Sequence, residues 1–171
     1  MNSLVVQATE LPTRFREVMA RVASPVTVVT SIMDGVPHGT TVSAFASLSM
    51  RPPMVLVSLD RASQLLAVVR QTWRFGVNVL GAKQSAAALA FARKGGSDKF
   101  DGIPWEVQHR LPRLSGAPGW LACDVSGLVD GGDHVVVLGM VVSAETTGEH
   151  PLIYYRRTFG THGQLAPSDN P

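Results

Sequence analysis

The sequence predicts a mainly β fold of the α+β class, an antiparallel β-barrel with about three peripheral helices. Roughly seven runs rich in Val, Ile and Thr are separated by short, turn-forming connections, which is typical of antiparallel strands. Three helical patterns interrupt these runs. The chain has 171 residues, of which 45% are hydrophobic, so it can bury the core of one domain and has no room for a second.

The first helical pattern lies near the N-terminus, after a Pro-Thr start signal at residues 12–13. Four apolar residues follow this signal at i, i+3, i+4 and i+7, namely Phe15, Val18, Met19 and Val22. We therefore expect a helix that packs its apolar face on the core. Residues 1–11 have no clean period and residues 166–171 are rich in Pro, Ser, Asp and Asn. We expect both ends to be loose and residues 12–165 to form the domain.

A β-hairpin is expected next. Residues 25–32 are rich in Val and Thr, the dipeptide Asp34-Gly35 is a strong turn signal, and residues 41–49 resume in extended form. Residues 54–59 (MVLVSL) are nearly all apolar, which predicts a strand covered on both faces.

Two further helices are predicted in the middle of the chain, with a short strand at residues 75–80 between them. The first helix has the apolar stripe Leu65, Leu66, Val68 and Val69, with Ser63 near its start. The second is the Ala-rich segment 84–93. Residues 94–102 are too polar and glycine-rich for either element, so we expect a loop there.

Three strands are predicted in the C-terminal third of the chain. Residues 120–129 and 134–144 are two long β-like runs joined by Asp-Gly-Gly-Asp at 130–133, and residues 152–155 form a last short run.

Composition argues against several classes of partner. The 15 basic residues nearly balance the 13 acidic ones, so the charge surplus needed for nucleic acid is absent although the pI is about 9.0. The longest uncharged apolar run, residues 135–144, is half a membrane span. We therefore expect no membrane contact and a cytoplasmic location. The single cysteine, Cys123, excludes an internal disulfide and predicts a buried structural thiol.

The familiar catalytic motifs are also missing from the sequence. It has no dinucleotide fingerprint after a strand, no phosphate loop ending in Gly-Lys-Ser/Thr, and no nucleophile elbow. Its five histidines never have the close spacing of a zinc site, so no metal is expected.

The stretch HGTTVSAFASLSM, residues 38–50, is the most informative. Simple alternation turns Val42, Ala44, Ala46 and Leu48 towards the core, and Thr41, Ser43, Ser47 and Ser49 the other way together with Phe45. One interpretation is an ordinary half-solvated strand. The other is an anion or ring site, because hydroxyl and backbone N–H groups satisfy phosphate oxygens and small alanines let a planar ring approach the main chain.

Five segments in order, GTTVSAFASLSMRPPMVLVSL, FGVNVL, KGGSDKF, GGDHVVVLGMVVSAE and PLIYYRRTFG, resemble the short-chain flavin reductase family. The resemblance spans residues 15–162. It implies an FMN-binding split-barrel fold, NAD(P)H:flavin oxidoreductase activity, and supply of reduced flavin to a partner monooxygenase. It also implies a homodimer with flavin near the subunit interface, using FMN or FAD and either NADH or NADPH.

The resemblance assigns roles to particular residues. It places Thr41, Val42, Ser43 and Ala44 along the isoalloxazine edge, and makes Ser47, Ser58 and Ser63 candidates for the ribityl chain and phosphate. It places His134 beside the nicotinamide as the catalytic candidate, on a turn where Gly131 and Gly132, which lack a Cβ, let main chain come close to the ligand. It adds as cofactor-binding candidates Asn78, Arg93, Lys99, Phe100, Gly132, Asp133 and Tyr154.

Four of these candidates have structural alternatives. Asn78 could be a buried amide that satisfies backbone groups, and Lys99 a solvated loop charge. Arg93 could complement a helix C-terminus, and Tyr154 could be a core or interface residue.

Two other functions remain open at this stage. A split barrel could instead hold flavin tightly and act on an organic substrate in a biosynthetic pathway. It could also be a non-catalytic flavin- or haem-binding protein, with His134 as a possible axial ligand.

Overall fold

The computed structural model describes residues 2–162, with side chains from residue 10 onward. The elements follow one another as α1 (Asn2–Met19), β1 (Ser24–Pro25), β2 (Thr27–Met33), β3 (Val36–Val42), β4 (Phe45–Met50), β5 (Pro53–Asp60), α2 (Gln64–Thr72), β6 (Arg74–Val79), α3 (Ser85–Ala92), a 3₁₀ turn (Ser97–Phe100), β7 (Trp105–Gln108), β8 (Leu111–Leu114), β9 (Gly119–Gly131), β10 (His134–Thr146), β11 (Ile153–Tyr155) and β12 (Thr158–Gly160).

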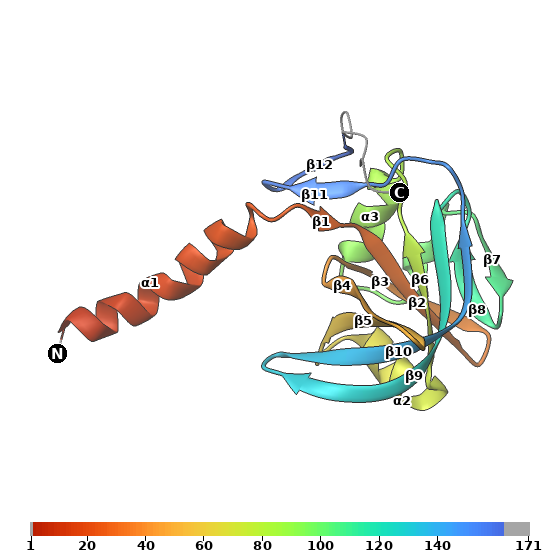
Figure 1. Cartoon of the computed structure of the whole chain (residues 1–171), viewed down its shortest axis with the longest axis horizontal. Helices are drawn as coiled ribbons and strands as arrows, with labels where there is room; N and C mark the ends of the chain where they lie inside the picture. The colour runs from red at the N-terminus through yellow and green to blue at the C-terminus, as the bar shows by residue number, and fades with distance from the viewer. Residues whose placement is uncertain (1, 163–171) are drawn as a thin grey trace.

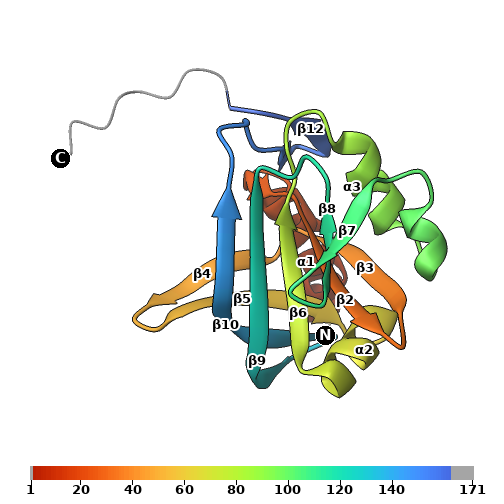
Figure 2. The ribbon, with the colours of Figure 1, turned by 90° about the vertical axis from the view of Figure 1, so that its right-hand side faces the viewer.

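Seven antiparallel strands form the main sheet, in the order β3-β2-β6-β9-β10-β5-β4. The two outermost strands, β3 and β4, are consecutive in the chain and are joined only by Ser43 and Ala44. The sheet must therefore curl until its two edges approach, which gives a barrel that is split along this seam (Figures 1 and 2). The predicted mainly antiparallel fold with three helices is confirmed.

Two small sheets accompany the barrel. The β7–β8 hairpin stands beside the main sheet, and β1, β11 and β12 form a three-stranded sheet at one end of it (Figures 1 and 2). The β9–β10 hairpin, α2, α3 and β6 match the sequence prediction. The β2–β3 hairpin turns at Asp34-Gly35 as predicted, but its second strand covers residues 36–42 instead of 41–49. The β7–β8 hairpin, β1 and β12 were not predicted.

Each of the two helices that cover the barrel closes one hydrophobic cluster. Leu65, Leu66 and Val69 of α2 pack with Phe75 and Val137 of the sheet. Ala87, Ala88 and Phe91 of α3 pack with Phe100 and Leu80. Burial of these apolar surfaces supplies the main stabilisation of both helices, which are too short to be stable alone.

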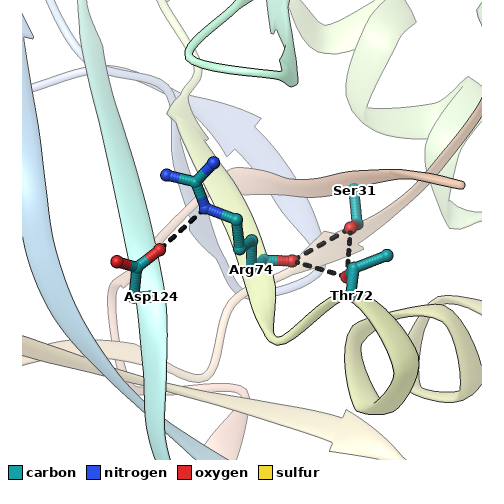
Figure 3. Close-up of polar contacts among 4 residues, drawn as sticks. All are labelled: Ser31, Thr72, Arg74 and Asp124. Carbon is teal, nitrogen blue, oxygen red and sulfur yellow. Dashed lines mark hydrogen bonds and ion pairs between the residues drawn. The ribbon is translucent and has the colours of Figure 1, made fainter.

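A polar cluster fixes the C-terminal end of α2 against the sheet (Figure 3). The Ser31 hydroxyl donates to the Arg74 carbonyl at 2.9 Å, and the Thr72 hydroxyl, 3.1 Å from that of Ser31, reaches the same carbonyl at 3.3 Å. The Arg74 side chain bonds Asp124 on β9 at 2.7 Å. These contacts set the position of α2, whose opposite end borders the candidate site described below.

The first helix differs from its prediction in length and in packing. It begins at Asn2 and carries Pro12 inside it, so the helix starts well before the predicted start signal at residues 12–13. It extends away from the barrel (Figure 1), and its apolar residues Leu11, Phe15, Val18 and Met19 are exposed together with Val22, which follows the helix. The predicted helix is therefore present, but the core of this chain does not cover the apolar side of the helix. Residues 166–171 lie outside the described residues.

The expected single strand over residues 41–49 is broken. β3 ends at Val42 and β4 begins at Phe45, so the alternation changes phase between them. Val42 is buried as predicted, but Phe45 turns to the core while Ala44, Ala46 and Leu48 are exposed.

Strand β5 is also less enclosed than expected. Val55, Val57 and Leu59 are buried, whereas Met54, Leu56 and Ser58 on its other face are half-buried. Cys123 is fully buried, as predicted. Among the described residues, no helix is long and apolar enough to cross a membrane.

Candidate functional site

Two adjoining cavities lie where the seam of the barrel meets α2 and the β9–β10 turn. The histidine cavity, of about 200 Å³, is lined by Thr41, Val42, Ser43, Ala44, Ser58 and His134 among others. The lysine cavity, of about 390 Å³, is lined by residues that include His38, Gln64, Arg93, Lys94 and Lys99. Thr40, Asp60 and Ser63 line both cavities, so the two form one continuous cleft.

The strand break supplies accessible backbone to the histidine cavity. Ser43 and Ala44 lie outside both ladders, because the β2–β3 register ends at Val42 and the β4–β5 register begins at Phe45. Their carbonyls accept hydrogen bonds from Phe45 N–H and Ser58 N–H at 3.0 Å each. Both residues are exposed and have small side chains, so a flat ligand can reach their main chain.

The β9–β10 turn brings His134 to the same cavity. His134 pairs with Asp60 across the β10–β5 ladder, and its Nδ1 lies 2.8 Å from Asp133 Oδ1. This hydrogen bond lowers the pKa of the Asp133 carboxyl. Gly132 has a positive φ of 68°, which explains why a glycine suits this turn.

Arg61 holds the turn in place, although the sequence did not indicate it. Its Nε donates to the Gly132 carbonyl at 2.8 Å, and its guanidinium bonds Asp130 at 2.7 Å. Its backbone N–H donates to the Asp133 carbonyl at 3.0 Å. Three contacts from one residue thus join the end of β5 to the turn that carries His134.

Lys99 is the buried cation of the lysine cavity. Its side chain is only 7% exposed, so it is not a solvated loop charge. Nζ donates to the carbonyls of Gly39 at 3.2 Å and Phe91 at 3.4 Å. Burial lowers the pKa of this ammonium, an effect that Asp98 opposes and Arg93 reinforces.

Arg93 and Lys94 follow the C-terminus of α3 and are exposed. Arg93 Nε donates to the Ala90 carbonyl of the last helical turn at 3.4 Å, so it serves the helix end as well as lining the cavity. Ser63 is the N-cap residue of α2, and its hydroxyl makes no capping hydrogen bond. Ser63 lines both cavities, and its hydroxyl has no capping role in the helix.

Four of the site residues expected from the sequence lie elsewhere. Asn78 is fully buried, donates to the Val28 carbonyl at 3.2 Å and accepts from Leu114 N–H at 2.8 Å, so its amide serves the backbone. Phe100 packs in the core at 4.7 Å from the Phe91 ring and cannot cover a ligand in the cleft. Ser47 is exposed on β4, outside the lining of both cavities.

Tyr154 lies near the base of α1 instead of in the cleft. It is 37% exposed, its ring centroid is 5.2 Å from that of Phe159, and it lines a separate hollow with Met19 and Ser43. Ser43 thus borders both this hollow and the histidine cavity.

The site includes residues that the sequence analysis missed, namely His38, Asp60, Arg61, Gln64 and Lys94. His38 begins the informative stretch and Lys94 begins the predicted loop, but their approach depends on the packing of β3 against α3. Gly39 permits this packing, since a Cβ there would lie 2.8 Å from the Phe91 ring.

Fold and cleft together define a split-barrel protein whose cleft combines open main chain and small side chains at one end with cations at the other. The chain belongs to the flavin reductase family: the model of the flavin reductase like domain matches residues 19–163.

Known proteins similar to this chain are flavin reductases and reductase components. It is 41% identical over 146 residues to the reductase component of a 4-nitrophenol 4-monooxygenase/4-nitrocatechol 2-monooxygenase from Rhodococcus opacus, covering 85% of this chain and 78% of that protein. It is 37% identical over 164 residues to the NADH:riboflavin 5'-phosphate oxidoreductase of Streptomyces pristinaespiralis, covering 92% of each chain. The NADH:FAD oxidoreductase of Streptomyces globisporus C-1027, solved in complex with NAD and FAD fragments, superposes with a TM-score of 0.83 at 30% identity, over 93% of this chain and 95% of that one.

Proposed function

We propose that this chain is an NADH-dependent flavin reductase that delivers reduced flavin to a separate monooxygenase. The observation that carries the proposal is the histidine cavity, where the open main chain of Ser43 and Ala44 and the side chain of His134 line one space. The names of the similar proteins support both the activity and the donor, NADH.

The residues present fit a flavin. Small side chains at the strand break leave room for its ring, and the neighbouring lysine cavity supplies cations for its phosphate. When bound, flavin and nicotinamide carry the chemistry themselves, a hydride transfer from nicotinamide C4 to flavin N5. The protein has to hold the two rings together and control access to them.

Each part of the cleft has a proposed task in this reaction. Thr41, Val42, Ser43 and Ala44 contact the ring edge, and main-chain N–H groups there stabilise the negative charge of reduced flavin. Ser58 and Ser63 contact the ribityl chain. Arg93 and Lys99 attract the phosphate, and His134 orients the nicotinamide, supported by Gly132 and Asp133.

A homodimer is part of this proposal. The exposed apolar side chains of α1 and the residue after it need a covering surface, and a second copy of the chain would provide one. The hollow that contains Tyr154 joins the base of α1 to Ser43, so a partner bound there would lie beside the flavin edge. A cytoplasmic location is also proposed, because NADH is supplied there.

The test is NADH absorbance over time with purified protein, first alone and then with added FMN or FAD under air. We expect consumption that starts only with free flavin and saturates with its concentration. A yellow protein inert to NADH and NADPH would instead favour a tightly bound flavin that acts on another substrate. Absence of flavin binding would contradict the proposal.

Delivery of reduced flavin needs its own measurement. Reductase and a flavin-dependent monooxygenase of a similar two-component system are placed on opposite sides of a dialysis membrane with NADH and flavin. Product formation across the membrane is expected if reduced flavin diffuses freely. Product formed only when the proteins mix would point to direct transfer.

A further inference from the structure

We propose that the basic surface between α1 and the β11–β12 turn binds an acidic surface of the monooxygenase that receives the reduced flavin. The inference rests on the proposed function and specifies where the partner docks. The surface is a hollow of about 560 Å³, the arginine hollow, whose charged lining residues are Arg14, Glu17, Arg21, Arg156 and Arg157. All four arginines are exposed, so a partner can reach them.

The first observation is the surplus of positive charge at this end of the molecule. Four arginines line the hollow, and two carboxylates accompany them: Glu17 in the lining, and Glu10, which accepts a hydrogen bond from Arg14 at 2.7 Å. The surplus of two positive charges is as large as the formal net charge of the whole chain, +2. A guanidinium pairs with a carboxylate through two parallel hydrogen bonds, so the matching surface on a partner is acidic.

The second observation is that the turn keeps two arginines where the backbone favours other residues. Arg156 and Arg157 are the central residues of the β11–β12 turn, with φ of 49° and 62°, where Asn or Gly is usual. Arg156 N–H donates to the Ala20 carbonyl at 2.9 Å, so the turn is fixed beside the C-terminal end of α1 (Figure 1). The fold thus holds two adjacent arginines next to the helix in spite of backbone strain, which points to a use for their side chains.

The third observation is that the arginine hollow leads to the ring end of the cleft. Arg157 and Ala20 line both the arginine hollow and the hollow that contains Tyr154. Ser43 in turn lines both the latter hollow and the histidine cavity. A protein bound at the arginine hollow therefore lies near the end of the cleft from which the flavin ring would leave.

This surface remains available in the proposed dimer. Phe15 and Met19 lie in the apolar stripe of α1, whereas Arg14 and Glu17 lie outside it. A second copy that covers the stripe therefore leaves the arginines at the polar rim of its interface. Exposed charges at a rim mainly raise the rate of association, which suits a short-lived contact for delivery.

Anionic phospholipids also carry groups that arginine binds, but the geometry favours a protein. A helix that lies on a membrane carries its cations on its own polar face. Here two of the four arginines belong to a separate turn, and the four together line a hollow between that turn and the helix. A projecting acidic loop or helix end fits such a hollow better than a flat lipid surface does.

The first experiment measures binding of a fluorescein-labelled decaglutamate peptide by fluorescence anisotropy, without flavin or NADH. The unmodified chain is compared with the double variant Arg156→Gln, Arg157→Gln and with the control Arg51→Gln, Arg70→Gln. The control removes two exposed arginines that lie outside the lining of the cavities and hollows described above. Circular dichroism and light scattering check that the fold and the mass of both variants are unchanged.

We expect the double variant to bind the peptide about fivefold more weakly than the unmodified chain at about 20 mM salt, because it loses two exposed ion pairs. The control should change the affinity little, and the difference between the variants should shrink at about 150 mM salt, where exposed charges are screened. Equal weakening in the two variants, or no binding by the unmodified chain, would overturn the inference.

The second experiment uses the oxygenase component of the Rhodococcus opacus 4-nitrophenol system as the acceptor of reduced flavin. We expect the 4-nitrophenol consumed per NADH oxidised to fall about twofold in the double variant and to stay unchanged in the control. The rate of NADH oxidation with free flavin should be the same in all three proteins, because Arg156 and Arg157 lie outside the cleft. An equal yield in the two variants would overturn the assignment of this surface to a monooxygenase.

The outcomes separate this inference from the proposed function. Peptide binding that depends on Arg156 and Arg157, in a chain that oxidises no NADH, would contradict the proposed function while supporting an acidic docking partner. Flavin reduction with equal peptide binding in both variants would refute the inference alone. Phosphatidylserine vesicles that bind the unmodified chain but not the double variant, without binding of the peptide, would assign the arginines to a membrane and refute the inference.

Discussion

His134 Nδ1 lies 2.8 Å from Asp133 Oδ1, so the catalytic candidate is oriented by the residue that precedes it. The contact involves one ring nitrogen and makes Nε2 the atom that can serve a ligand in the histidine cavity. Arg61 fixes the same turn from the end of β5. A short turn, a carboxylate and a remote arginine together define where the imidazole can point.

His134→Ala should raise the KM for NADH about tenfold and the KM for flavin much less, because the proposed contact is to the nicotinamide. Steady-state kinetics with each substrate varied in turn measures both constants. His109→Ala is the control, since His109 lies in the β7–β8 turn, outside the lining of both cavities. Equal changes in the two constants, or none, would reject this role for His134.

Asn78→Ala should reduce stability without altering substrate binding. The buried amide bonds the Val28 carbonyl and Leu114 N–H, and losing it leaves both groups without this partner. We expect a loss of about 2–4 kcal/mol, or roughly 5–10 °C in Tm. Thermal unfolding measures the loss, and kinetics at a temperature where the variant is folded should give nearly unchanged KM values. A large rise in the KM for flavin would instead return Asn78 to the site.

The sequence predicted hairpins where the turn residues carry a conventional signal. Asp34-Gly35 and the glycines at 131–132 marked the β2–β3 and β9–β10 turns correctly. The two missed hairpins turn at His109-Arg110 and at Arg156-Arg157, and all four of these residues have φ between 49° and 62°. Such turns usually use Asn or Gly, so tertiary packing has overridden local preference there.

The site was predicted where it depends on local sequence and missed where it depends on packing. Thr41–Ala44 and His134, which the family resemblance assigned to one site, do line one cavity. The simple alternation over residues 41–49 failed because the break at Ser43 and Ala44 shifts its phase. His38 and Lys94 are brought together only by the contact of β3 with α3, which no spacing in the chain reveals.

Arg110→Gly should stabilise the protein. Arg110 has a φ of 62°, a conformation that costs an ordinary residue about 1 kcal/mol and glycine almost nothing. We expect an increase of about 1 kcal/mol in the free energy of unfolding, measured with urea. Glu106→Gly, at an exposed position in strand β7, is the comparison variant and should lower the free energy of unfolding. A loss of stability in Arg110→Gly would show that its side chain matters more than its backbone strain.

The double variant Phe15→Glu, Val18→Glu should convert the proposed dimer to monomer. Both side chains are more than 60% exposed on α1 in the single chain, and a charge at either position is costly inside an apolar interface. Light scattering after size-exclusion chromatography measures the mass. Glu17→Gln, a change outside the apolar stripe of the same helix, should leave the mass unchanged. A monomeric unmodified chain would contradict the proposed dimer, and a dimeric double variant would exclude α1 as its interface.

Cys123 should make stability fall at alkaline pH. Burial, reinforced by Asp124, raises the pKa of its thiol from 9.0 to about 12. Because the unfolded chain then loses this proton at lower pH than the folded chain, stability from this group falls as pH rises above 9 and continues to fall up to about 12.

Between about pH 8 and 10 we expect the free energy of unfolding to fall by about 1.4 kcal/mol through this thiol, a loss that Cys123→Ala does not show. Urea unfolding of both proteins at the two pH values isolates the contribution of the thiol, because the packing lost on replacing cysteine by alanine destabilises the variant equally at each pH. Parallel pH dependence in the two proteins would mean that the folded thiol ionises with an ordinary pKa.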